Sequence, residues 1–93
     1  MSTPSIIRRK VLISGKVQGV GFRETCRTVA AENHVFGSVK NLDDGRVEAF
    51  FEGGENAVAI VLDWCKVGPP FARVEKVEVS KEEPRGETEF VVR

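Results

Sequence analysis

Hydrophobic and polar positions alternate near the start of the chain and then change to a helical spacing. From Arg9 to Ser14, Val11 and Ile13 share one face of a predicted strand. From Phe22 to about Asn33, apolar side chains recur at the spacing of one side of an amphipathic helix. The pattern therefore predicts a strand, a connecting loop and a helix.

The next segment is typical of a β-hairpin. Residues 36 to 42 form a predicted second strand, and Asp43-Asp44-Gly45 supplies an Asp-Gly turn. In the third strand, residues 47 to 52, Val47, Ala49 and Phe51 alternate with residues of the other face. Gly53-Gly54 is expected to break this pattern.

The remaining chain predicts a second helix and two strands. Apolar residues at helical spacing run from about Glu55 to Val67, and Gly68-Pro69-Pro70 ends the helix. A fourth strand is expected from Val74 to Ser80, with Val77 and Val79 facing inward, and residues 88 to 92 could add a short edge strand.

The order strand, helix, strand, strand, helix, strand predicts an α+β fold. It is the ferredoxin-like, split βαβ sandwich (βαββαβ), with an antiparallel sheet and both helices on one face. The chain has 93 residues, so we expect a single domain over residues 1 to 93.

Composition and charge narrow the set of partners. The sequence has 14 basic and 14 acidic residues, so no broad electrostatic field attracts nucleic acid or an acidic membrane. No apolar run approaches the roughly 20 residues of a membrane span. Met1 to Ile7 lacks the pattern of a secretory signal. We therefore expect a cytoplasmic monomer that binds neither nucleic acid nor membrane.

The glycine-rich segment Gly15 to Arg23 joins the first strand to the first helix. Glycines let the backbone turn tightly and expose N–H groups, and a helix N-terminus adds unpaired donors. Arg23 adds a planar guanidinium suited to phosphate oxygens. Five basic residues precede the first acidic residue, Glu24, although a solvated edge or strand end explains Arg8, Arg9 and Lys10 better than an anion site does. The alternative is a glycine turn followed by a surface arginine.

Topology places a second polar residue beside this loop. In a right-handed βαβ crossover, the start of the helix and the end of the second strand share one edge of the sheet. Arg23 and Asn41 occupy those two places. An arginine, a backbone anion cradle and a carboxamide can together bind a phosphoryl group and hold a water molecule.

Three segments resemble the signature of the acylphosphatase family. They are Gly15-Lys16-Val17-Gln18-Gly19-Val20-Gly21-Phe22-Arg23, Gly37-Ser38-Val39-Lys40-Asn41 and Asp44-Gly45-Arg46-Val47-Glu48. The resemblance implies hydrolysis of the carboxyl-phosphate bond of small acyl phosphates without a metal or cofactor. Inorganic phosphate would be both product and competitive inhibitor.

The resemblance also implies roles for individual residues. The catalytic residues are Arg23, which binds phosphate oxygens, and Asn41, which orients the attacking water, while a phosphate oxygen accepts the proton of that water. The implied substrate-binding residues are Gln18, Gly19, Val20, Gly21, Phe22 and Arg23. Ser38 departs from the family, which often has tryptophan there; it should face away from Asn41, so that only packing changes.

Other conspicuous residues have structural interpretations. The single histidine, His34, suits a helix-ending turn, and Asp43 and Asp44 suit the hairpin turn. Cys26 and Cys65 lie on inward helical stripes and could be neighbours, with free thiols favoured over a disulfide.

Two alternatives to the enzyme remain open at this point. The first is a catalytically silent ferredoxin-like regulatory or binding module. Its RNA-recognition form needs aromatic side chains on the open sheet face, where Phe50 is the clear candidate. The second is an inactive acylphosphatase-like domain resembling the amino-terminal domain of a hydrogenase-maturation protein. Retention of Arg23 and Asn41 favours activity.

Overall fold

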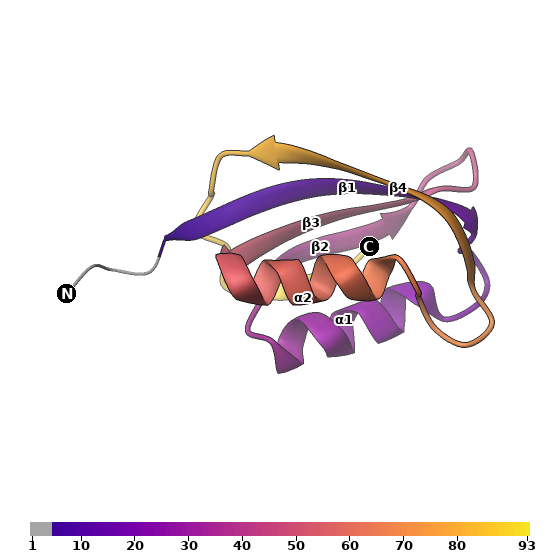
Figure 1. Cartoon of the computed structure of the whole chain (residues 1–93), viewed down its shortest axis with the longest axis horizontal. Coiled ribbons are helices and arrows are strands. Elements are labelled where there is room, and N and C mark those ends of the chain that lie inside the picture. Colours follow the sequence, from indigo (N-terminus) through magenta and orange to yellow (C-terminus); the bar gives the residue numbers. More distant parts are fainter. Residues whose placement is uncertain (1–4) are drawn as a thin grey trace.

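The computed structural model describes residues 5–93 and contains two helices and five strands. Residues 1–4, part of the segment Met1 to Ile7 considered for a secretory signal, lie outside the described part. The elements in chain order are β1 (Ile6–Lys16), α1 (Phe22–Glu32), β2 (Phe36–Asn41), β3 (Val47–Gly54), α2 (Glu55–Cys65), β4 (Arg73–Glu82) and β5 (Phe90–Val92). Both helices cover the same face of the sheet (Figure 1). The predicted α+β ferredoxin-like arrangement is confirmed.

The sheet has the strand order β4-β1-β3-β2-β5 and is mixed, not antiparallel throughout as predicted. β1, β2, β3 and β4 pair antiparallel, whereas β5 pairs parallel to β2. The correction has a topological reason. β4 ends at the same end of the sheet at which β2 begins. The following chain crosses this end to the opposite edge of the sheet, so β5 runs in the same direction as β2.

One detail of the predicted strands is wrong. Gly53 and Gly54 do not break β3, because they continue its pairing with Ile7 and Ile6 of β1. Val79 pairs with the core residue Val11 and so points to the helix-covered face, as predicted, but it stays 47% exposed. β4 is an edge strand, and α2 packs chiefly over β1 and β3, so the outer strand lacks a complete helical cover.

The core lies between the sheet and the two helices. Its fully buried large side chains include Phe22, Phe51, Ile13, Val11, Val39, Val58 and Val61. The two helices meet where Phe22 of α1 contacts the half-buried Trp64 of α2. The centroids of the two rings are 5.0 Å apart. Phe22, the first residue of α1, therefore anchors the start of that helix in the core. No helix within residues 5–93 is long and apolar enough to cross a membrane.

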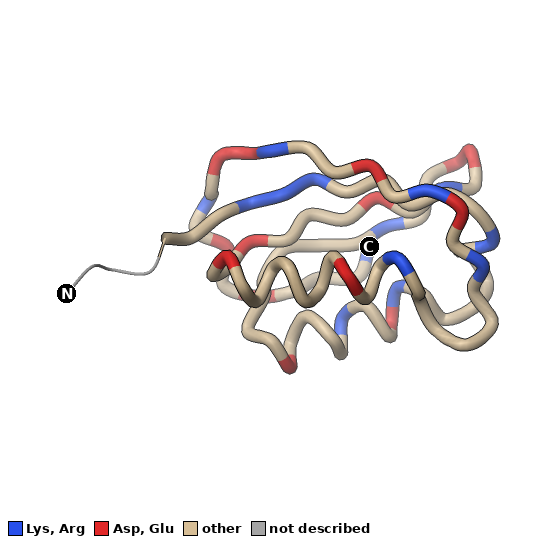
Figure 2. The backbone as a smooth tube through the Cα atoms, viewed as in Figure 1, with Lys and Arg blue, Asp and Glu red and all other residues tan. Residues whose placement is uncertain are grey.

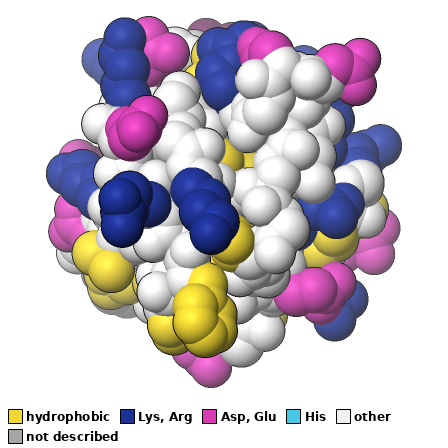
Figure 3. Space-filling view, turned by 90° about the vertical axis from the view of Figure 1, so that its right-hand side faces the viewer, with side chains coloured by type: hydrophobic (Ala, Val, Ile, Leu, Met, Phe, Trp, Pro, Cys, Tyr) yellow, Lys and Arg dark blue, Asp and Glu magenta, His cyan; other side chains and the backbone are white. Residues whose placement is uncertain are grey.

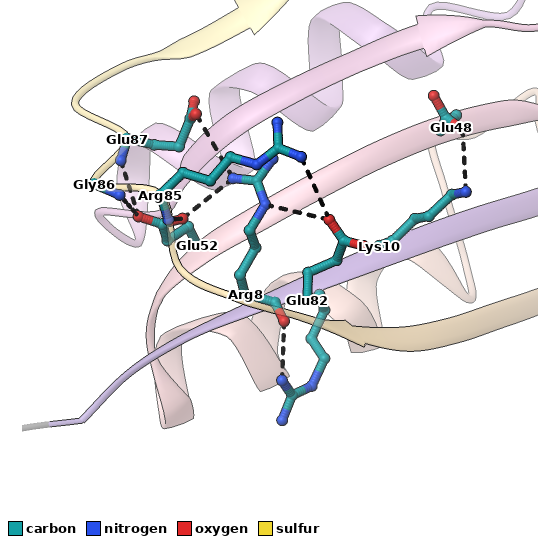
Figure 4. Close-up of polar contacts among 9 residues, drawn as sticks. Arg8, Lys10, Glu48, Glu52, Glu82, Arg85, Gly86 and Glu87 are labelled. Carbon is teal, nitrogen blue, oxygen red and sulfur yellow. Dashed lines mark hydrogen bonds and ion pairs between the residues drawn. The ribbon is translucent and has the colours of Figure 1, made fainter.

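A buried charged cluster fixes the segment between β4 and β5 (Figure 4). Nη1 of Arg8 lies 3.2 Å from Oε1 of Glu52, and each side chain is only 3% exposed. The Glu52 carboxylate also accepts backbone N–H groups from Arg85, Gly86 and Glu87 at 2.7, 2.8 and 2.9 Å. These contacts hold the connecting segment against the sheet and so direct β5 toward β2.

The solvated-edge interpretation of the early basic residues is therefore wrong for Arg8. β1 is an inner strand that pairs on both sides, with β3 and β4, so Arg8 is enclosed and its charge is matched by Glu52. Lys10 is more exposed and lies 3.8 Å from a carboxylate oxygen of Glu48. Each of the two cations is thus paired with a carboxylate of β3.

Candidate active site

The loop between β1 and α1 has the geometry of an anion cradle. Gly19 and Gly21 have φ values of 73° and 78°, in the left-handed region that side chains other than glycine rarely adopt. Within residues 5–93, the N–H groups of Gly19, Val20 and Gly21 donate to no backbone acceptor. Helix α1 then begins at Phe22 without a side-chain cap. Unpaired donors and the positive end of a helix dipole therefore meet in one place.

A pocket of about 120 Å³ opens beside this loop. Its lining residues come from the loop, the start of α1, the end of β2 and β5: Val17, Gly19, Gly21, Phe22, Arg23, Glu24, Asn41 and Val92. The structure thus brings Arg23 and Asn41 together with the glycine loop. Since one water molecule needs about 10 to 15 Å³ of such volume, the pocket has room for a small anionic group.

Arg23 is held by the backbone of the edge strand. Its Nη1 donates a hydrogen bond of 2.8 Å to the backbone oxygen of Arg93, and the Arg93 N–H donates to the oxygen of Val39 in β2 at 2.8 Å. A guanidinium has five N–H donors. One contact therefore fixes the Arg23 side chain and leaves other donors for a ligand in the pocket that it lines.

Asn41 lines the same pocket and carries an unsatisfied acceptor. It is the last residue of β2, and its Oδ1 atom is buried without a hydrogen-bond partner among residues 5–93. A buried amide oxygen without a partner costs free energy, and a donor that enters the pocket would relieve this cost. A water molecule is such a donor.

The other residues predicted for the site differ in position. Phe22 lines the pocket with its ring anchored in the core, whereas Gln18 and Val20 do not line it. The Gln18 side chain turns instead toward the β2–β3 hairpin and hydrogen-bonds two backbone oxygens there. Only its backbone remains available to the cradle.

Sequence reasoning did not identify Glu24 as part of the pocket wall. Its carboxylate lies at the rim, 70% exposed, with Oε2 3.5 Å from Nη2 of Arg27 one helical turn later. The residue follows Arg23 directly, so its position could have been found from the helix start alone. An exposed carboxylate here opposes the positive potential of the cradle.

The hairpin and helix-end residues have structural roles. Asp44 accepts the Arg46 backbone N–H at 3.1 Å and the Arg46 Nε at 2.8 Å, and the Arg46 backbone bond is the main cause that lowers the pKa of Asp44. His34 is exposed and has a left-handed φ of 55° just after α1. Within residues 5–93, no three His, Cys, Asp or Glu side chains are grouped as a metal site.

The open face of the sheet does not present a free aromatic platform. Phe50 lies beneath the guanidinium of Arg8, whose Cζ is 4.9 Å from the ring centroid. Ser38 pairs with Phe50 in the β2–β3 register and lines a hollow on this face, away from the pocket of Asn41. The expectation that Ser38 faces away from Asn41 is confirmed.

The pocket lies at the end of the molecule where the β1–α1 loop, the end of β2 and the α2–β4 loop meet (Figure 1). Acidic residues at this end mark the tip of the β2–β3 hairpin (Figure 2). Viewed onto this end, Lys and Arg side chains, with Asp and Glu side chains among them, stand around a surface made largely of uncharged atoms (Figure 3). Charges of both signs therefore surround this end of the molecule.

An arginine, free loop amides and a carboxamide thus share one pocket on a ferredoxin-like sheet. The acylphosphatase family profile matches residues 9–92. An acylphosphatase of a Roseiflexus species is 55% identical over 86% of this chain and 86% of its own. One from Natronomonas pharaonis is 48% identical over 94% and 95%. The structure of an acylphosphatase from Coxiella burnetii superposes with a TM-score of 0.94 at 37% identity, over the whole of both chains.

The chain belongs to the acylphosphatase family. It is therefore an enzyme that hydrolyses acyl phosphates. This function is better supported than that of a catalytically silent ferredoxin-like module.

Proposed function

We propose that Arg23 and the loop amides from Gln18 to Phe22 bind the phosphoryl group of an acyl phosphate, and that Asn41 orients the attacking water. One observation carries this assignment: Asn41, whose Oδ1 atom is buried without a hydrogen-bond partner among residues 5–93, lines the pocket that Arg23 and the glycine loop also line. The pocket thus combines donors for an anion with one acceptor for a neutral nucleophile.

The reaction follows from these two functions. Oδ1 of Asn41 accepts one O–H of the water and directs a lone pair of the water oxygen toward phosphorus. A new P–O bond forms as the bond between phosphorus and the carboxyl oxygen breaks, and the leaving carboxylate keeps the electron pair. Arg23 and the loop N–H groups stabilise the charge on the phosphoryl oxygens in the transition state.

The proton of the water passes to a phosphoryl oxygen of the substrate. The one carboxylate in the described lining, Glu24, is exposed and lies beside Arg27, and it is therefore not assigned as a base. The products are a carboxylate and dihydrogen phosphate, so that atoms and charge balance. Because a carboxylate is a good leaving group, positioning and charge stabilisation supply most of what the reaction needs.

The contacts assigned here are made with the phosphoryl group and the water, and none is assigned to the acyl part. The acyl group of a small acyl phosphate can therefore vary. Inorganic phosphate fits the same contacts and acts as a competitive inhibitor.

The remaining proposals concern the state of the protein in the cell. Cys26 and Cys65 are both buried and free, which suits the reducing cytoplasm. We propose that the protein acts as a monomer, because Arg23, Asn41 and the glycine loop meet within one chain.

Hydrolysis of benzoyl phosphate in ¹⁸O-labelled water tests the reaction. The assay contains EDTA, and an alkyl monophosphate is the control substrate. We expect hydrolysis of benzoyl phosphate only, competitive inhibition by inorganic phosphate, and one ¹⁸O atom in the phosphate product. Label in the benzoate would show attack at the carbonyl carbon and would overturn the roles of Arg23 and Asn41.

A further inference from the structure

The side chain of Gln18 joins the two halves of the active site. Its Nε2 atom donates hydrogen bonds to the backbone oxygens of Leu42, at 2.7 Å, and of Arg46, at 3.0 Å. Gln18 lies in the phosphate loop, 24 and 28 residues before these partners. The two contacts therefore connect the loop to both sides of the turn between β2 and β3.

These contacts are made at the neck of the hairpin. The Leu42 N–H donates to the Arg46 oxygen at 2.8 Å, and the Gly45 N–H donates to the Leu42 oxygen at 3.2 Å. Gln18 thus uses both N–H groups of one amide to bind the two carbonyls that close this turn. The turn itself is braced on its outer side by the contacts of Asp44 with Arg46.

The neck of the hairpin determines where Asn41 lies. Leu42 follows Asn41 directly, and Asn41 is the last residue of β2. The pairing of β2 with β3 positions Asn41 relative to the sheet. The hydrogen bonds of Gln18 fix the distance between Asn41 and the phosphate loop. Within residues 5–93, the side-chain hydrogen bonds between this loop and the hairpin are all made by Gln18.

We propose that Gln18 is a positioning residue, which sets the place of the Asn41 water relative to the bound phosphoryl group. This inference rests on the proposed function, in which Asn41 orients the nucleophile. A displacement of about 1 Å in such a reaction can cost about 100-fold in rate. The side chain of Gln18 acts through the hairpin, whereas its backbone belongs to the cradle.

The test uses variants of similar size. Gln18→Met removes both donors but keeps the length of the side chain. Asn33→Leu is the matched control, because the Asn33 amide also donates to a backbone oxygen, that of Val29 at 2.8 Å, at the far end of α1. We expect Gln18→Met to lower kcat at least about tenfold while the Kd for inorganic phosphate changes less than about threefold. Asn33→Leu should leave both values unchanged.

A double-mutant cycle separates positioning from a general structural role. If Gln18 acts through Asn41, then Gln18→Met should lower kcat little further in a protein that already carries Asn41→Ala. An equal fold-loss of kcat in both backgrounds would overturn the proposal. So would an unchanged kcat of Gln18→Met, or a loss of phosphate binding as large as the loss of kcat.

A second variant covers the case in which Gln18→Met fails to fold. Gln18→Glu keeps the shape of the side chain, but its ionised carboxylate cannot donate a hydrogen bond. Protonation restores one donor, so kcat relative to the wild type should rise as the pH falls toward the glutamate pKa of about 4.3. A constant ratio across this pH range would contradict a donor role for Gln18. Failure of Arg23→Ala to lose activity would instead contradict the proposed function, independently of Gln18.

Discussion

Arg8 and Glu52, separated by 44 residues, form a buried ion pair on the open face of the sheet, with Nη1 and Oε1 3.2 Å apart. Glu52 also binds three consecutive backbone N–H groups of the segment between β4 and β5 (Figure 4). The pair therefore supports the strand whose end holds Arg23. The pair both holds this segment against the sheet and neutralises a buried carboxylate.

The first prediction concerns the stability of the fold. Arg8→Met leaves the Glu52 carboxylate buried without its cation, so we expect a loss of about 3 to 5 kcal/mol in the free energy of unfolding. Lys10→Met is the matched control, because Lys10 loses a more exposed pair with Glu48. It should cost less than about 1 kcal/mol. Urea denaturation of both variants measures the difference, and equal losses would contradict the buried role of Arg8.

The second prediction concerns acid stability. Burial raises the pKa of Glu52, but hydrogen bonds from the backbone of Arg85 and Glu87, the Arg8 side chain and the backbone of Gly86 outweigh it and lower the pKa. The unfolded chain then binds a proton at a higher pH than the folded chain. Stability is complete above the ordinary glutamate pKa of about 4.3 and declines as the pH falls through the lower folded pKa.

Glu52→Gln should flatten this decline. The variant lacks the titrating carboxylate, so the difference in unfolding free energy from the wild type should shrink as the pH drops below about 4.3. Asp44→Asn provides a comparison at an exposed carboxylate whose pKa is also lowered. Urea titrations at several acidic pH values would detect the change, and a difference that does not vary with pH would show that Glu52 is not the group that titrates.

The third prediction separates phosphate binding from water positioning. Arg23→Ala removes a cation from the pocket and should weaken inorganic phosphate binding and abolish most activity. Asn41→Ala should leave phosphate binding nearly intact while kcat falls about 100- to 1,000-fold, as expected when a preorganised polar group of the transition state is lost. Calorimetric phosphate titration and steady-state kinetics measure the two effects.

Arg85→Ala is the control for loss of an arginine. Its side chain is exposed on the segment between β4 and β5, 3.9 Å from a carboxylate oxygen of Glu82, and does not line the pocket. It should preserve both phosphate binding and kcat. If Arg23→Ala and Asn41→Ala weakened phosphate binding equally, the separate roles of the two residues would be untenable.

Local patterns were sufficient to predict the elements and the neighbourhood of the pocket. The apolar spacing predicted α1, and the right-handed crossover predicted that Arg23 and Asn41 share one edge, as they do. Both inferences depend on short-range periodicity and a strong topological rule.

Features that depend on distant contacts could not be predicted in the same way. The burial of Arg8 requires Glu52, and the parallel pairing of β5 requires a crossing whose path is fixed by the backbone N–H groups at Glu52. The side chain of Gln18 looked like part of a phosphate loop, yet its partners lie in the hairpin. No periodicity in the sequence encodes these partners.

The fourth prediction concerns the carboxylate at the rim of the pocket. Glu24→Gln removes a negative charge beside the anion cradle, so affinity for inorganic phosphate should rise by up to about fivefold, the equivalent of about 1 kcal/mol between nearby charges in water. Added salt should reduce this gain by screening. Glu32→Gln, in the last turn of the same helix, is the control and should have little effect. Equal gains from both variants would indicate a general charge effect and not one of the pocket.

The fifth prediction concerns the two thiols of the core. Cys26 and Cys65 are free and fully buried, one on each helix. A hydrogen bond with the Cys65 thiol and burial raise the pKa of Cys26 well above its ordinary value. Since the thiolate is the reactive form, this shift protects Cys26, and burial encloses both sulfurs, so both side chains should resist alkylation in the folded protein.

Iodoacetamide labelling followed by mass spectrometry measures this protection. We expect almost no adduct on the native protein and two adducts per chain once urea unfolds it, since burial and not chemistry alone limits the reaction. Activity should not change during the native incubation, because neither thiol lines the pocket of Arg23 and Asn41. Rapid labelling of either native cysteine would show that the two helices open far more readily than their packing around Phe22 and Trp64 indicates.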